Sequence, residues 1–268
     1  MRPGPFHEPH EPVASPEKLI AQYWSVARNE DEAQYFANVA NVDDSIGRLL
    51  QALSQQQLRD NTLIIFSSDN GPETLDRYKN ATRCYGTPGP LRGMKLHTTE
   101  GGFRVPGIVS WPARIKSGQV LSTPVSALDF LPTFCDLAGI EPPENVALDG
   151  TSFLPVLYGQ ELSRDKPLIW AYFNAITEAR VAMRDGRWKV LAKLDGGRIP
   201  KMENITSESL PTVADARLTD FEIYDLSIDT AEANDLSGEQ PVEAQRLAEK
   251  LQQYYHELVT NSHVWQPL

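Results

Sequence analysis

The sequence lacks several features that would assign it to a specialised class of protein. Its 268 residues contain no apolar run of about 18 or more, so we expect no transmembrane helix. The stretch from Met1 to His7 lacks the apolar core of a secretory signal peptide. Cysteine is scarce: Cys84 and Cys135 are too few for a disulfide framework. We expect two buried thiols, with a single disulfide as the alternative.

Positive charge is also in short supply. The chain has 25 Lys and Arg against 36 Asp and Glu, a net charge of −11, and no basic block. This balance disfavours nucleic acid and anionic membranes as partners. An anionic substrate would have to be held by local cations or by a metal.

What the chain does contain is typical of a globular protein, with 41% hydrophobic and 23% charged residues. Apolar residues recur at three- and four-residue spacing over 31–57, which predicts a long helix. The run 62–67 is apolar on both faces and predicts a buried strand of a parallel sheet. A helix that leads into such a strand favours an α/β fold, and the Gly- and Pro-rich stretch 71–105 predicts a long functional loop.

Further along the chain, 105–111 predicts a strand and 129–138 a helix that Gly139 ends. From residue 166 onward, short strands are predicted at 168–172, 180–184, 188–191 and 221–224, with a hairpin turn at Asp185-Gly186. An amphipathic helix is predicted at 242–258. We therefore expect two domains, residues 1–165 and a small antiparallel α+β subdomain at residues 166–268.

Three groups of residues are candidates for chemistry. Asp69 and Asn70 follow the predicted buried strand and offer hard oxygens suited to Ca²⁺ or Mg²⁺, although Asx-Gly is also ordinary turn chemistry. His10 lies between prolines that would fix its imidazole for proton transfer, or it is a surface histidine without a task. Lys95 lies in a glycine-lined loop where its ammonium could approach an oxyanion, or it is simply solvated.

The order and spacing of these groups resemble the type I, formylglycine-dependent sulfatases of the alkaline phosphatase superfamily. The resemblance covers about residues 5–160, and the nearest branch is the arylsulfatase and N-acetylgalactosamine-6-sulfatase group. The segments that carry it are Pro9-His10-Glu11-Pro12, Tyr35 through Asp43-Asp44-Ser45-Ile46-Gly47, Asn61 to Phe66 with Ser68-Asp69-Asn70-Gly71, Leu91-Arg92-Gly93-Met94-Lys95, Glu100 to Pro106, Trp111-Pro112, Asp129-Phe130-Leu131-Pro132-Thr133 and Asp149-Gly150.

The resemblance implies a fold and a set of roles. The chain would form the C-terminal part of the alkaline-phosphatase-like mixed sheet between helices, followed by the small antiparallel subdomain. Asp69 and Asn70 match Ca²⁺ ligands, Lys95 matches the lysine that grips the sulfate, and His10 matches the histidine beside the leaving-group oxygen. His7 falls where the family has no fixed role. The substrate would be a sulfated carbohydrate or an aryl sulfate ester, and such enzymes are usually exported to periplasm, extracellular space or lysosome.

One departure from the family is large. The formylglycine forms in a Cys-x-Pro-x-Arg or Cys-x-Ala-x-Arg stretch, and neither Cys84 nor Cys135 stands in one. Calcium takes about six to eight oxygens, and Asp69 and Asn70 supply only part of them. We therefore expect a C-terminal portion, inactive and poorly soluble alone, whose partner is the missing N-terminal half. A phosphodiesterase or phosphatase of the same superfamily, and a non-catalytic Ca²⁺- or sugar-binding remnant, remain as alternatives.

Overall fold

The computed structural model describes residue 10 and residues 13–75, 79, 84–144, 147–199, 202 and 204–266. The chain divides into two compact units, one up to Trp111 and one from Pro112 onward. The α-helices are α1 (Glu17–Ile20), α2 (Glu30–Gln55), α3 (Glu100–Phe103), α4 (Phe130–Ala138), α5 (Leu154–Leu157), α6 (Leu210–Asp215) and α7 (Pro241–Asn261). The strands are β1 (Ile64–Phe66), β2 (Ile108–Ser110), β3 (Leu168–Ala171), β4 (Ala179–Asp185), β5 (Trp188–Leu194) and β6 (Leu218–Asp225).

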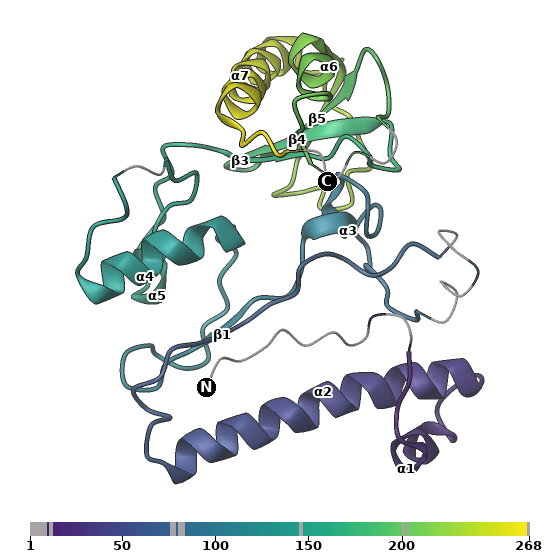
Figure 1. Cartoon of the computed structure of the whole chain (residues 1–268), viewed down its shortest axis with the longest axis vertical. Helices are drawn as coiled ribbons and strands as arrows, with labels where there is room; N and C mark the ends of the chain where they lie inside the picture. The colour runs from purple at the N-terminus through teal and green to yellow at the C-terminus, as the bar shows by residue number, and fades with distance from the viewer. Residues whose placement is uncertain are drawn as a thin grey trace. The chain divides into compact units, whose positions relative to one another are not determined.

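Helix α2 is the longest element of the first unit and confirms the helix predicted at 31–57 (Figure 1). Asn29 caps it by accepting a 2.9 Å hydrogen bond from the Glu32 backbone N–H, which satisfies one of the open donors of the first turn. Near this end, Ala33 and Ala37 are fully buried and cluster with Ile20 of α1. From Val39 to its end α2 contains no buried residue, although all of it is described, so the later turns of its apolar stripe are only partly covered.

Strand β1 differs from the prediction. It pairs antiparallel with β2, with Ile64 opposite Ser110 and Phe66 opposite Ile108. None of its residues is fully buried, and Phe66 is 40% exposed, so the prediction of a buried strand in a parallel sheet is wrong for the described residues. An apolar run indicates extended backbone, but the partner that completes the sheet lies far away in the sequence and is not encoded in the run itself. The mixed α/β class is confirmed.

The second unit holds the predicted antiparallel sheet, in the order β3-β4-β5-β6. The hairpin between β4 and β5 is closed by Asp185 opposite Trp188, and Gly186 has a φ of +58°, a conformation that glycine adopts without steric cost. The predicted C-terminal helix is α7, and α6 lies beside it on the same face of the sheet (Figure 1). This sheet begins at Leu168, whereas the compact units divide after Trp111; the domain boundary at 165/166 stays a prediction.

The two faces of this sheet differ in chemistry. Met183 and Val190 face a core that includes Leu251 of α7 and is made of apolar side chains. On the opposite face the Lys189 side chain is fully buried with its ammonium 3.5 Å from a carboxylate oxygen of Glu232, which is also fully buried. The Lys189 ammonium also lies 5.7 Å from the ring centroid of Trp170. A charge this deep needs an opposite charge, and the structure provides one. None of the described helices is both long and apolar enough to cross a membrane.

Candidate functional site

A close approach of backbones organises the polar loop that follows β1. The Gly71 N–H donates to the Gly102 carbonyl at 2.8 Å, and the Gly101 N–H donates to the Arg92 carbonyl at 2.7 Å. A Cβ on Gly71 would lie 1.8 Å from the Gly101 oxygen, and one on Gly101 would lie 2.2 Å from the Gly93 oxygen. The segments at 71, at 92–93 and at 101–102 therefore fit together only because these positions carry no side chain.

Asp69 and Asn70 lie between the end of β1 and this glycine contact. Asp69 is exposed and Asn70 is partly buried. The Asn70 side-chain nitrogen donates to the Gly71 carbonyl at 2.9 Å, so the amide oxygen is the atom that Asn70 can offer to a cation. Ser68 donates to the Asn70 carbonyl at 3.2 Å, which braces the turn. The pair fits part of a Ca²⁺ shell by its chemistry, because carboxylate and amide oxygens are the ligands that this ion prefers. Within the described ranges no three His, Cys, Asp or Glu side chains group as a metal site.

Lys95 is attached to the three residues that follow Gly71. Its backbone N–H donates to the Pro72 carbonyl at 2.8 Å, and its carbonyl accepts a hydrogen bond from the Thr74 hydroxyl. Its ammonium lies 3.6 Å from a carboxylate oxygen of Glu73, and the two side chains are only 16% and 9% exposed. The structure therefore brings Lys95 next to the segment that carries Asp69 and Asn70. Glu73 was not among the predicted site residues, because an acidic residue in an irregular stretch has no distinguishing pattern.

His10 is exposed and lies at a bend of the chain. The prolines that flank its dipeptide, Pro9 and Pro12, fall outside the described residues, as does His7. The role of His10 in proton transfer stays a prediction.

The segment that holds Cys84 is anchored on the start of α2. The Tyr85 hydroxyl donates to the Asn29 side chain at 2.9 Å, and the Arg28 guanidinium lies 5.4 Å from the Tyr85 ring centroid. Burial raises the pKa of the neighbouring Tyr35 hydroxyl above its ordinary value. Both Cys84 and Cys135 belong to the described residues, where they are buried thiols, as predicted, and not a disulfide.

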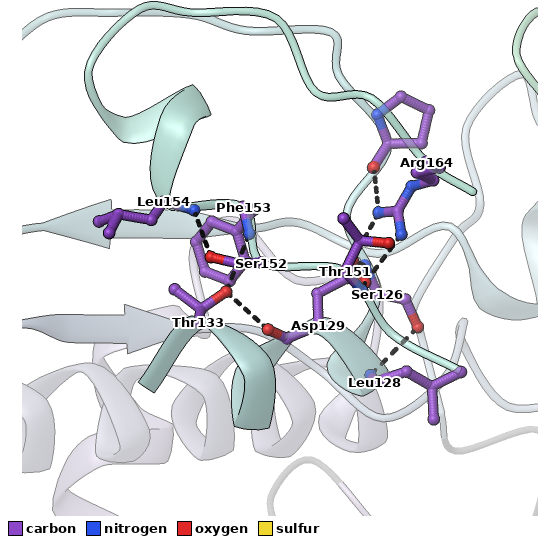
Figure 2. A network of polar contacts seen from close by, with 10 residues as sticks. Ser126, Leu128, Asp129, Thr133, Thr151, Ser152, Phe153, Leu154 and Arg164 are labelled. Carbon is purple, nitrogen blue, oxygen red and sulfur yellow. Dashed lines mark hydrogen bonds and ion pairs between the residues drawn. The ribbon is translucent and has the colours of Figure 1, made fainter. Parts of the chain in front are cut away.

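A second polar network lies in the other unit, around Asp129 (Figure 2). The Asp129 carboxylate is fully buried and receives both terminal nitrogens of Arg164, at 2.8 and 2.5 Å. The same carboxylate accepts the backbone N–H groups of Ser126 at 2.7 Å and Thr151 at 2.9 Å. The backbone carbonyl of Asp129 accepts a hydrogen bond from the Thr133 hydroxyl at 2.6 Å.

The Asp129 network extends to the loop that contains Asp149-Gly150. A Cβ on Gly150 would lie 2.0 Å from the Leu128 carbonyl, so only glycine lets this loop reach the start of α4. The Thr133 hydroxyl in turn accepts the Phe153 N–H at 2.9 Å. Asp129 thus anchors one loop on another, and Arg164 is a partner that no sequence pattern revealed.

The family model described as Sulfatase matches residues 5–140, half of the chain. The chain belongs to the sulfatase family. A second model, N-sulphoglucosamine sulphohydrolase, C-terminal, matches residues 95–195.

Curated relatives match about half of this chain. Steryl-sulfatase of Rattus norvegicus is 37% identical over 141 residues, which is 53% of this chain and 24% of the relative. N-acetylgalactosamine-6-sulfatase of Canis lupus familiaris is 35% identical over 137 residues, which is 51% of this chain and 25% of the relative. The match therefore spans about a quarter of the length of these relatives.

The fold of this chain also matches solved structures. One comes from work on glycosaminoglycan metabolism by Bacteroides thetaiotaomicron and superposes with a TM-score of 0.70 at 25% identity. That alignment covers 93% of this chain and 49% of the other. The likeness confirms the predicted fold family, and the chain spans about half the length of this neighbour.

Proposed function

We propose that this chain carries part of the active site of a calcium-dependent sulfatase that hydrolyses sulfate esters. The observation that supports it best is the set of contacts between Lys95 and residues 72–74, which follow Asp69 and Asn70 after one glycine. A cation-binding oxygen pair and an ammonium on adjacent segments are the groups that a sulfate ester requires, because its oxygens are negatively charged.

Each of these residues has a distinct task in the proposed reaction. Asp69 and Asn70 hold Ca²⁺ through their side-chain oxygens, and Lys95 binds a sulfate oxygen through its ammonium. His10 gives a proton to the oxygen of the departing alcohol, since an imidazole exchanges protons near neutral pH. When bound, calcium would neutralise charge on the sulfate oxygens, and formylglycine would supply the nucleophile.

The nucleophile and the remaining calcium ligands come from polypeptide outside these 268 residues. Neither cysteine lies in the motif that formylglycine formation requires: Cys84 is followed by Tyr85-Gly86-Thr87-Pro88, and Cys135 by Asp136-Leu137-Ala138-Gly139. We therefore expect no turnover of an aryl sulfate by this chain alone.

A sulfated carbohydrate or an aryl sulfate is the proposed substrate class. The relatives named above are a steryl-sulfatase and an N-acetylgalactosamine-6-sulfatase, so their names include a sterol and an amino sugar. Export to the periplasm, the extracellular space or the lysosome, which is usual for such enzymes, is an expectation that comes with this proposed function.

Calcium binding by the enzyme that is completed with the remaining ligands tests the proposal. Isothermal titration with CaCl₂ should show binding that Asp69→Asn weakens at least about tenfold, because one ligand charge is removed. The matched control is Asp44→Asn, an exposed aspartate of α2, which should leave the titration unchanged. Equal calcium affinity of the wild type and Asp69→Asn would refute the assigned ligand. In an enzyme completed with the nucleophile, faster hydrolysis of an aryl phosphate than of an aryl sulfate would favour the phosphatase alternative.

A further inference from the structure

We propose that Glu73 is a positioning residue that holds the Lys95 ammonium in place for the sulfate group. The inference rests on the proposed function, in which Lys95 binds a sulfate oxygen. It adds a residue to that site and assigns it a role that acts only through Lys95.

The Glu73 carboxylate is fixed at both oxygens. One oxygen accepts the Thr74 backbone N–H at 3.0 Å, and the other lies 3.6 Å from the Lys95 ammonium. The first contact holds the carboxylate to its own loop, so it presents a fixed negative charge to the lysine. Because the two side chains are only 9% and 16% exposed, solvent screens their attraction less than it screens a surface pair.

The ion pair is not needed to hold the Lys95 backbone. Pro72 and Thr74 already bind that backbone through its N–H and its carbonyl. What the ion pair adds is an orientation of the flexible side chain, which otherwise loses up to about 2 kcal/mol of rotamer freedom when it binds a ligand. A lysine that is oriented beforehand binds an anion without that loss.

The Lys95 ammonium can still serve a second acceptor. It carries three N–H donors, and the 3.6 Å contact with Glu73 engages it less tightly than a charge-assisted hydrogen bond of about 2.8 Å would. The fully buried pair of Lys189 and Glu232 offers a contrast, since neither of those side chains reaches solvent. Lys95 is partly exposed, so an anion can reach it. In a chain of net charge −11, an oriented cation is needed to attract a sulfate.

The experiment follows the NMR signal of the Lys95 ammonium while sulfate is titrated into the protein. Nuclear magnetic resonance of ¹⁵N-labelled lysine ammonium groups reports the Lys95 signal, which Lys95→Met identifies by its loss. Sodium sulfate is titrated into the wild type, Glu73→Gln, Glu73→Asp and Lys95→Met. The matched control is Glu32→Gln, which removes the charge of a largely buried glutamate that pairs with Arg28 at 2.6 Å in the same unit.

We expect sulfate to shift the Lys95 signal of the wild type and Lys95→Met to lose the binding. Glu73→Gln should broaden that signal and raise the sulfate dissociation constant about tenfold, while Glu73→Asp recovers part of the loss and Glu32→Gln changes neither. If Glu73→Gln binds sulfate as tightly as the wild type or more tightly, while Lys95→Met does not bind, Glu73 competes for the ammonium or has no role, and only this inference fails. If the wild type does not bind sulfate, or binds it no better than Lys95→Met, the assigned role of Lys95 fails and the inference fails with it.

Discussion

The replacement Asp129→Asn should destabilise the second unit by about 3 kcal/mol, because it removes one charge of a buried ion pair. One Asp129 oxygen accepts from Thr151 and from one Arg164 nitrogen, and the other accepts from Ser126 and from the second Arg164 nitrogen. An asparagine keeps only one of these oxygens. In either orientation its amino group faces two N–H donors, so two hydrogen bonds are lost at once.

The magnitude follows from burial. Breaking a buried ion pair costs about 3–5 kcal/mol, since the remaining charge is left without compensation. Arg164 is 15% exposed, so water relieves part of its isolation, which places the cost at the lower end, about 3 kcal/mol. Combining Asp129→Asn with Arg164→Met should cost less than the sum of the two single replacements, because the double variant leaves no charge to isolate.

The assay is urea unfolding followed by circular dichroism, with hydrogen exchange of the Thr151 amide as a local measure. The matched control is Asp149→Asn: Asp149 pairs with Lys166 at 2.9 Å, but the two side chains are 65% and 41% exposed. Such a surface pair contributes about 1 kcal/mol at most. If Asp129→Asn costs no more than Asp149→Asn, the Asp129 network stabilises the unit no more than a surface ion pair does.

Three further predictions follow from single contacts. Gly71→Ala should cost about 3 kcal/mol or more in urea unfolding, because its Cβ would lie 1.8 Å from a backbone oxygen, whereas Gly47→Ala in α2, with nothing within 4 Å, should gain about 1 kcal/mol. Burial raises the pKa of Tyr255 to about 12, so the stability that the neutral Tyr255 hydroxyl contributes is complete below about pH 10 and is lost as the pH rises through 12. In urea melts at pH 8 to 12, the free energy of unfolding of Tyr255→Phe should therefore lack about 2 kcal/mol of the alkaline decrease that the wild type shows. Ile108 is 59% exposed beside another exposed apolar side chain, so Ile108→Thr should reduce self-association in light scattering.

Each of these has a clear contrary result. Equal stability of the two glycine variants would mean that the loop relaxes around a methyl group. A Tyr255→Phe melt with the same alkaline loss as the wild type would place the titrating group elsewhere. Unchanged scattering by Ile108→Thr would show that this apolar position is not a contact between copies.

Local pattern predicted the elements whose stability is largely local. The spacing of apolar residues predicted α2 and α7, and Asp185-Gly186 predicted the hairpin of β4 and β5. Helix faces and tight turns depend on residues that are close together in the sequence, so a local pattern is enough to predict them. The position of β1 in the sequence was predicted, but its burial and its strand pairing were not. Its antiparallel partner, β2, lies beyond the long loop, and nothing in either run selects the other.

The candidate site was only partly predictable for a related reason. Asp69, Asn70 and Lys95 stood out because their residue types and spacing match a family pattern. Glu73 and Arg164 act through contacts between irregular segments, where no periodicity indicates which residues meet. The glycines at 71 and 101 lie in the stretch that was predicted only as a long Gly- and Pro-rich loop, and the structure uses them to bring backbones together.

The buried pair of Lys189 and Glu232 also fixes the alignment of the second sheet. Neighbouring residues of a strand face opposite sides, so a slip of β5 by one position would exchange Lys189 with Val190. The Lys189 ammonium would then enter the apolar core beneath α7 without its carboxylate partner, while a valine would face Glu232. Hairpins paired in the wrong register would therefore be far higher in energy than the native one, so a single ion pair would select the native register during folding.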